Sequence, residues 1–316
     1  MTDPPFRGAI AVLGFGNQGE AQALNLRDSG CEVVVGARAG TGAQRARARG
    51  FEVRSIPAAA ANARVVAVLL PDEAVPEAWP EIAAACAPRA TVVFAHGFNL
   101  LYGGLALPPT CDVVLVAPTG PGFVLRERFV AGQGLPAYLA VAQNASGDAW
   151  GMAERYATAL GSARARLWRT TVAEETEVDL FGEQVVLCGG VNALVTAAFD
   201  TLVARGYSAE IAYLECVHQL KFLADLLHER GIAGMRRGIS GTAQFGDLTR
   251  GPRVIGPAAR AEMAHILDEI RSGEFAREWR SEVAAGAPRL REMLEISARH
   301  PIEGARRRAL GASDEA

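Results

Sequence analysis

The chain has 316 residues, half of them hydrophobic and 21% charged, which suits a packed globular protein with room for two domains. Its net charge of -3 gives no electrostatic case for nucleic acid or an anionic membrane, and no apolar run reaches the roughly 18 residues of a membrane span. The N-terminus lacks a signal-peptide pattern and the five cysteines lack paired or metal-type spacing, so we expect a cytoplasmic protein.

The first half of the chain alternates strand-like and helix-like segments. Apolar runs rich in β-branched residues are strand candidates, and they lie at residues 9–13, 32–36, 65–70, 91–95 and 113–117. Strands separated by helices form right-handed βαβ units. We therefore predict an α/β Rossmann domain with a parallel sheet over residues 1–169.

The pattern changes near Thr170. Beyond it the β-rich runs disappear, and apolar residues recur at helical spacing over residues 174–204, 208–229 and 258–272. This predicts an all-helical second domain over residues 170–316. We expect the tail after Glu303 to be frayed.

The first strand candidate runs into Gly14-Phe15-Gly16-Asn17-Gln18-Gly19, a G-x-G-x-x-G motif. In such a turn the first glycine permits the tight bend, the second lets the backbone approach a pyrophosphate, and the third lets helix and strand pack closely. The phosphates then lie at a helix N-terminus, where free N–H groups favour negative charge. Placed between a strand and a helix, the motif predicts a dinucleotide site; the alternative is a glycine turn without a ligand.

The end of the second strand distinguishes the two nicotinamide cofactors. NAD enzymes usually carry an acidic residue there for the ribose 2′-OH, but this segment reads Gly36-Ala37-Arg38-Ala39-Gly40-Thr41-Gly42. Arg38 can face a 2′-phosphate and Thr41 can hydrogen-bond it, which favours NADPH over NADH. The alternative is that Arg38 is a solvated loop charge.

Two acidic residues at helical spacing suggest a metal site in the second domain. Asp179 and Glu183 are four residues apart, so a helix places them on one face, with apolar residues around them. A carboxylate pair near a core is costly without compensation, and Mg²⁺ prefers such ligands. The alternative is a solvated acidic face.

Longer motifs, in order along nearly the whole chain, resemble the short, class I form of the ketol-acid reductoisomerases. They are the glycine turn with residues 23–30, Leu70-Pro71-Asp72-Glu73, Phe94-Ala95-His96-Gly97-Phe98-Asn99, Val116-Ala117-Pro118, residues 174–190, Tyr213-Leu214-Glu215-Cys216, Gly246-Asp247, residues 251–255 and His300-Pro301-Ile302-Glu303. The resemblance implies an NADPH-binding Rossmann domain and a knotted helical domain that dimerises and builds the active site. It also implies alkyl migration in a 2-hydroxy-2-alkyl-3-keto acid, assisted by two Mg²⁺ ions, followed by hydride transfer from NADPH.

The resemblance assigns roles to individual residues. Asp179 would bridge both metals, Glu183 would bind one and Glu215 the other. Ser240 would contact the substrate carboxylate, and His96 would lie near the nicotinamide and the metal waters. The cofactor would also be contacted by Leu70, Pro71 and Asp72.

Three positions depart from the family pattern. The family's Val-Ala-Pro-Lys-Gly-Pro-Gly-His reads here with Thr119 for lysine and Phe123 for histidine, and Gln219 replaces a metal-binding glutamate. Nearly all basic residues here are arginine, so drift would have given arginine at 119. In the family that lysine and glutamate lie close and neutralise each other. Losing both leaves the formal charge unchanged, whereas losing one would strand a buried charge.

The departures predict a changed chemistry. A second Mg²⁺ would have one carboxylate, Glu215, so we expect one bound ion. Isomerisation should suffer most, which predicts a reductase of a carbonyl or imine in a different small polar substrate. The alternatives are an authentic ketol-acid reductoisomerase of branched-chain amino acid biosynthesis and a non-catalytic NADPH-binding protein. In each case we expect a homodimer or higher homo-oligomer without nucleic acid or membrane partners.

Overall fold

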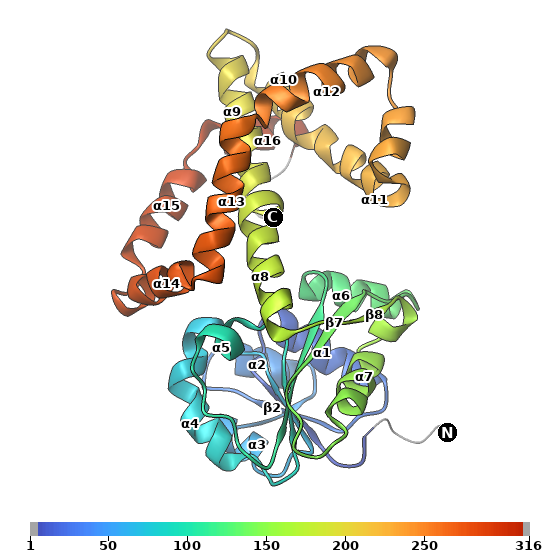
Figure 1. Ribbon diagram of the computed structural model, residues 1–316, viewed down its shortest axis with the longest axis vertical. Helices are drawn as coiled ribbons and strands as arrows, with labels where there is room; N and C mark the ends of the chain where they lie inside the picture. The colour runs from blue at the N-terminus through green and yellow to red at the C-terminus, as the bar shows by residue number, and fades with distance from the viewer. Residues whose placement is uncertain (1–5, 312–316) are drawn as a thin grey trace. The chain divides into compact units, whose positions relative to one another are not determined.

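The computed structural model describes residues 6–311 and divides the chain into two compact units, Met1–Val178 and Asp179–Ala316. Figure 1 follows the chain by colour from the first unit, in blue and green, to the second, in yellow and red. The boundary falls within helix α8 (Val172–Gly182), past the Thr170 expected from the sequence. The expected lack of a signal peptide depends in part on residues 1–5, and the expected frayed tail includes residues 312–316. Both ranges lie outside the described residues.

The first unit is built on an eight-stranded sheet in the order β3-β2-β1-β4-β5-β6-β7-β8. The strands are β1 (Ile10–Leu13), β2 (Val33–Gly36), β3 (Glu52–Arg54), β4 (Val65–Val68), β5 (Thr91–Phe94), β6 (Asp112–Pro118), β7 (Ala137–Gln143) and β8 (Leu167–Arg169). All neighbouring pairs are parallel except β6 and β7, which run antiparallel. The predicted Rossmann-type α/β class is confirmed, but the sequence did not predict β3, β7 or β8.

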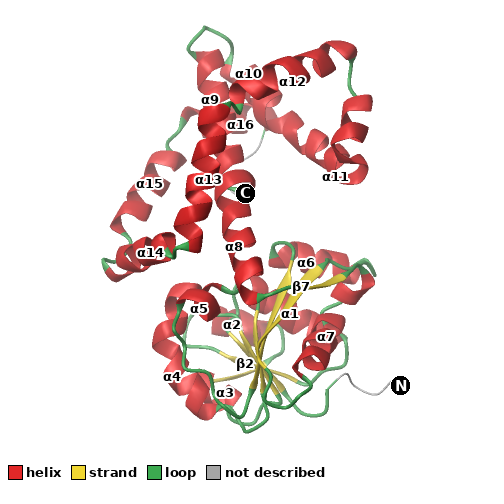
Figure 2. Ribbon diagram, in the orientation of Figure 1, coloured by secondary structure: helices red, strands yellow, loops and turns green. Residues whose placement is uncertain are grey.

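Helices cover both faces of this sheet, as its continuous apolar strands require. One buried cluster joins the sheet to α1 (Asn17–Asp28) and α7 (Ala149–Ala159). The other joins the opposite face to α3 (Ile56–Ala60) and α4 (Val75–Ala85), as Figure 2 shows. Because β1, β2, β4 and β5 are parallel, their carboxyl ends lie along one edge of the sheet, where α/β proteins bind ligands.

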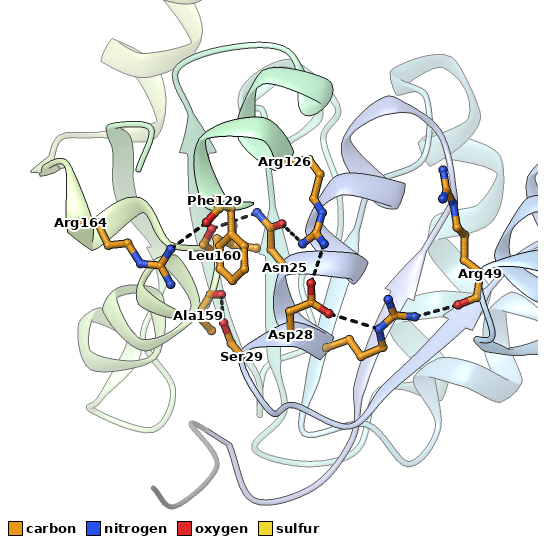
Figure 3. A network of polar contacts seen from close by, with 10 residues as sticks. Asn25, Asp28, Ser29, Arg49, Arg126, Phe129, Ala159, Leu160 and Arg164 are labelled. Atoms are coloured by element: carbon orange, nitrogen blue, oxygen red, sulfur yellow. Dashed lines mark hydrogen bonds and ion pairs between the residues drawn. The ribbon is translucent and has the colours of Figure 1, made fainter. Parts of the chain in front are cut away.

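A polar network fixes α1 against its neighbours (Figure 3). Arg126, on α6 (Gly122–Val130), donates to Asn25 Oδ1 at 2.9 Å and to Asp28 Oδ2 at 2.6 Å. Asn25 Nδ2 donates to the Leu160 carbonyl at 3.1 Å, just beyond α7. Each of these bonds joins residues about a hundred positions apart or more, so the helix that begins at the glycine turn is held from two sides.

The second unit is helical throughout its described part, which confirms the predicted class. It comprises the end of α8 followed by α9 (Gly189–Val203), α10 (Ala209–Tyr213), α11 (Gln219–Arg237), α12 (Gly241–Val254), α13 (Pro257–Arg271), α14 (Glu274–Ala284), α15 (Pro288–Ala298) and α16 (Pro301–Leu310). Two π turns, Glu183–Leu187 and Leu214–His218, interrupt segments that the sequence predicted as uninterrupted helices. The knotted path implied by the resemblance stays a prediction.

The tail up to Leu310 forms α16, so the prediction that it frays after Glu303 was wrong for these residues. His300 caps the helix because its Nδ1 accepts the Ile302 amide at 3.3 Å. Ala305 is buried among Phe199, Ala212 and Tyr213, which form a small apolar cluster. These contacts offset the entropy of ordering the tail.

Large apolar side chains of the helical unit lie exposed within the single chain. They include Leu194, Ile211, Phe222, Leu227, Phe245 and Leu248. In contrast to the expectation from the sequence, the stretch Val172–Val203 is long and apolar enough to cross a membrane by length and composition, although core helices of other proteins pass the same test. Where such side chains adjoin one another, the exposed apolar surface marks an interaction site.

The contact between α10 and α16 should weaken in acid. Arg308 Nε lies 2.5 Å from Glu210 Oε1, and this hydrogen bond, together with the Ser208 hydroxyl, lowers the pKa of Glu210 to about 2. The pKa of a glutamate in an unfolded chain is about 4.3. The stabilisation is therefore present above that value and is lost as the pH falls toward the folded pKa.

We expect wild type to melt at a higher temperature than Glu210→Gln at neutral pH, and the difference to vanish as the pH falls from about 4.5 to about 2. Thermal unfolding followed by circular dichroism would measure it. Glu295→Gln, which removes the exposed ion pair between α15 and Arg299 at its C-terminal cap, is the matched control and should show a smaller change. A pH-independent difference would refute the assignment.

Candidate active site

The glycine turn adopts the geometry that dinucleotide binding needs. Gly14 has φ of 96°, and a Cβ there would lie 2.5 Å from the Leu69 carbonyl oxygen. A Cβ on Gly19 would lie 2.3 Å from the Gly14 oxygen, whereas one on Gly16 would meet nothing within 4 Å. No side chain caps the start of α1, so its first N–H groups stay available to an anion.

Phe15 and Gln18, two further residues of the glycine turn, have different roles in the fold. Phe15 is buried and packs edge-on against Phe51, so its side chain belongs to the core. Gln18 Nε2 donates to the Gly120 carbonyl at 3.0 Å, while its Oε1 accepts from Gln22 Nε2 at 3.1 Å. The turn is thus tied to the segment after β6, where the sequence departs from the family pattern.

The loop after β2 places basic and hydroxyl groups at the same edge. Arg38 is exposed, and Thr41 is exposed at the start of α2 (Thr41–Ala48). Arg45, which the sequence analysis missed, donates from Nη2 to the Phe15 carbonyl at 2.5 Å and lies 3.5 Å from Glu20. Helix α2 therefore places the Arg45 side chain beside the glycine turn, where it is also paired with Glu20.

The loops after β4 and β5 are joined by a buried amide. Asn99 Nδ2 donates to the Asp72 carbonyl at 3.1 Å and to Asp72 Oδ1 at 2.9 Å. This bond fixes the predicted cofactor loop of Leu70, Pro71 and Asp72 to the segment that follows His96. The sequence analysis did not single out Asn99.

His96 faces a buried carboxylate that the sequence analysis also missed. Its Nδ1 lies 3.9 Å from Glu175 Oε1, and the Gly97 amide donates to Glu175 Oε2 at 3.2 Å. A Cβ on Gly97 would lie 1.9 Å from Thr176 Oγ1, so this glycine permits the close approach of α8. The available sequence signal was spacing, because Glu175 precedes Asp179 by one helical turn.

His96, Glu175 and Asp179 form the one group of three possible metal-ligand side chains found among residues 6–311. Carboxylate oxygens are the donors that Mg²⁺ prefers, so Glu175 and Asp179 would suit such an ion, with the His96 imidazole beside them. Glu183 and Glu215 lie exposed in the two π turns.

Other predicted site residues have local partners. Ser240 caps α12, its Oγ accepting the Ala243 amide at 3.2 Å. Thr119 is exposed, and both its hydroxyl and its amide donate to the Pro136 carbonyl, at 3.0 and 2.9 Å. Phe123 is 60% exposed on α6, and Gln219 is exposed at the start of α11. Thr119 therefore offers neither a charge nor a free hydroxyl proton.

Comparison with known proteins matches both parts of the chain to one family. The acetohydroxy acid isomeroreductase NADPH-binding domain matches residues 7–166, and the ketol-acid reductoisomerase C-terminal domain matches residues 172–311. An NADH-preferring ketol-acid reductoisomerase from an uncultured archean is 37% identical, with TM-score 0.94 over 98% of this chain and 95% of that one.

More distant structures share the fold alone. A semialdehyde dehydrogenase NAD-binding protein from Cupriavidus necator is 21% identical, with TM-score 0.68 over 86% of this chain and 99% of that one. A pyrroline-5-carboxylate reductase from Coxiella burnetii is 16% identical, with TM-score 0.51 over 90% and 98%.

Proposed function

The chain belongs to the ketol-acid reductoisomerase family and is a nicotinamide-dependent oxidoreductase, and from this premise we propose that it is a reductase with weak or no isomerase activity. Its substrate is a small polar molecule with a carbonyl or imine group. The observation that carries the proposal is the paired replacement of a family lysine and glutamate by Thr119 and Gln219.

The environment of Thr119 supports this proposal. A lysine at this position would supply a mobile cation, but the Thr119 hydroxyl donates to Pro136 and carries no charge. Gln219 offers at best a neutral amide oxygen to a metal. Isomerisation depends on strong polarisation of adjacent oxygens and loses most, whereas reduction needs one polarised group.

The proposed cofactor is NADPH rather than NADH. Arg38 and Thr41 supply a cation and a hydroxyl where an NAD enzyme usually has an acid, and Arg45 adds a second cation nearby. The 37% identical archaeal relative is described as NADH-preferring, so membership of the family does not by itself select the cofactor.

Asp179, with Glu183 and Glu215, would hold Mg²⁺, and we propose one ion rather than two. When bound, the metal supplies Lewis acidity and the nicotinamide supplies the hydride. Reduction of a carbonyl or imine also consumes a proton, and in this proposal a side chain of the protein supplies it. In this proposal His96, whose Nδ1 lies 3.9 Å from Oε1 of the buried Glu175, is the proton donor.

We further propose a cytoplasmic homodimer or higher homo-oligomer. The buried apolar cluster of the helical unit contains Phe199, Ala212, Tyr213 and Ala305. Many other large apolar side chains of this unit stay exposed. A second copy covering these side chains would remove the apolar surface from water. It would also cover the apolar stretch Val172–Val203 without a membrane.

The deciding experiment compares two substrates by NADPH oxidation with Mg²⁺. One is 2-acetolactate, which must be isomerised before it is reduced, and the other is 3-hydroxy-3-methyl-2-oxobutanoate, which is already isomerised. We expect kcat/KM to be at least about tenfold lower for 2-acetolactate, a barrier difference of about 1.4 kcal/mol. The double variant Thr119→Lys/Gln219→Glu should narrow that gap.

Comparable rates on both substrates would instead establish an authentic ketol-acid reductoisomerase of branched-chain amino acid biosynthesis. No NADPH oxidation with any keto acid or imine, with the dinucleotide still bound, would establish a non-catalytic NADPH-binding protein. Thr119→Lys alone is the control for the double variant, because it adds a cation without the carboxylate that balances it.

A further inference from the structure

Both helical segments that carry the expected metal-binding glutamates contain a five-residue π turn. One begins at Glu183, whose carbonyl accepts the amide of Cys188 at 2.9 Å, five residues later. The other contains Glu215 and is closed by the Gln219 amide on the Leu214 carbonyl. Such wide turns are rare and occur frequently at functional sites, so two of them at two expected ligands indicate a role.

A glycine pair permits the first of these turns. A Cβ on Gly189 would lie 2.0 Å from the Gln184 carbonyl oxygen, and one on Gly190 would lie 1.9 Å from the Val185 oxygen. Both obstacles are backbone atoms, which cannot rotate aside as a flexible side chain does. Each glycine also costs about 1 kcal/mol relative to alanine inside a helix, so the sequence gives up helix stability at this point.

We propose that Gly189 and Gly190 are positioning residues for the carboxylate of Glu183, because they permit the wide turn that begins there. The proposal rests on the proposed function, since the metal is part of it. The glycines themselves touch neither metal nor substrate. They act on the backbone path that presents Glu183.

The packing of α9 depends on the backbone path through the wide turn after Glu183. Each residue of an α-helix turns the chain by about 100° and advances it by about 1.5 Å. The wide turn accommodates one additional residue, so α9 can bury Phe199 against Ala212 and Tyr213, directly before the turn that contains Glu215. It therefore sets the direction of the Glu183 backbone relative to the apolar cluster beside the Glu215 segment, both within the second unit.

A neighbouring side chain is consistent with a ligand at this turn. Gln184 Nε2, adjacent to Glu183, is buried and has no acceptor among residues 6–311. A buried donor without a partner costs about 1–3 kcal/mol, so the folded chain is expected to gain an acceptor here from a ligand, a water or another subunit.

The test measures Mg²⁺ affinity by isothermal titration calorimetry, without dinucleotide or substrate, on wild type and Gly190→Ala. Circular dichroism and thermal unfolding report the fold of each protein. We expect Gly190→Ala to stay helical and to bind Mg²⁺ at least tenfold more weakly. Gly246→Ala in α12, where a Cβ meets nothing within 4 Å, is the matched control and should bind as wild type does.

Wild-type affinity in folded Gly190→Ala would overturn the inference. Should that variant fail to fold, deletion of the exposed Val186 replaces it, because removing one residue converts the wide turn to an α turn with both flanks in phase. This deletion should also bind at least tenfold more weakly, and unchanged binding overturns the inference. Absence of binding in wild type would overturn the proposed metal site and the inference together, so the two failures are distinguishable.

Discussion

Replacing Gly16 with alanine is expected to weaken NADPH binding at least about a hundredfold, or about 2.7 kcal/mol, while the unliganded protein stays as stable as before. Gly16 has φ of -87°, which alanine adopts readily, and a Cβ there meets no atom within 4 Å. The added methyl group would occupy the space into which a pyrophosphate must come at the start of α1. Fluorescence titration with NADPH and thermal unfolding without nucleotide measure the two effects separately.

Gly19→Ala is the matched variant, because it damages the turn itself. Its Cβ would lie 2.3 Å from the Gly14 carbonyl oxygen, so the helix must move away from the strand. We expect the unliganded protein to lose about 2–4 kcal/mol of stability as well as the cofactor. If Gly16→Ala bound NADPH as tightly as wild type, the glycine turn would not be the pyrophosphate site.

The parts of the fold that the sequence predicted are those determined by local pattern. β1, β4 and β5 are short runs that are buried along their whole length, so hydrophobicity alone marks them. β7 mixes buried, partly buried and exposed residues without a regular period, and β8 has three residues at the sheet edge. The antiparallel direction of β7 depends on where its connection leaves the sheet, which no residue in the strand encodes.

The candidate site likewise has one part that the sequence predicted and another that it did not. The glycine turn was predictable because its geometry depends on six consecutive residues. Glu175 was missed because its burial depends on Gly97, which lies 78 positions away. The sequence predicted that Asp179 and Glu183 lie near a core, with a solvated face as the alternative, but both are exposed. The enclosed carboxylate is that of Glu175, and only its contact with Gly97, in the loop after β5, shows this.

The π turns could not be predicted from periodicity. Residues 174–204 carry apolar side chains at spacings that also fit an uninterrupted helix, and a single additional residue shifts this pattern too little to be detected. The glycine pair after Leu187 was the available signal, but glycine also occurs inside helices at close packing contacts and near their C-terminal ends. At Gly189 and Gly190 a Cβ would meet the carbonyl oxygens of residues five positions earlier, which is the spacing of a π turn.

Asp179→Asn is expected to lower Mg²⁺-dependent turnover at least about a hundredfold and to weaken Mg²⁺ binding at least about tenfold. Asparagine keeps the size of the side chain but replaces a charged oxygen ligand by a neutral amide. Asp179 belongs to the group with His96 and Glu175, so the loss should fall on the step that needs a polarised oxygen. Initial rates as a function of Mg²⁺ concentration measure both quantities.

Glu174→Gln separates metal binding from the general charge of the helix. Glu174 lies on the same α8, loses the same charge, is exposed and accepts a hydrogen bond from Thr170 Oγ1 outside the candidate group. We expect its Mg²⁺ affinity and turnover to stay within about twofold of wild type, because exposed charges are screened. If both substitutions reduced Mg²⁺ affinity equally, the ion would respond to the summed negative potential of α8 rather than to a ligand at Asp179, and the assignment of this residue would fail.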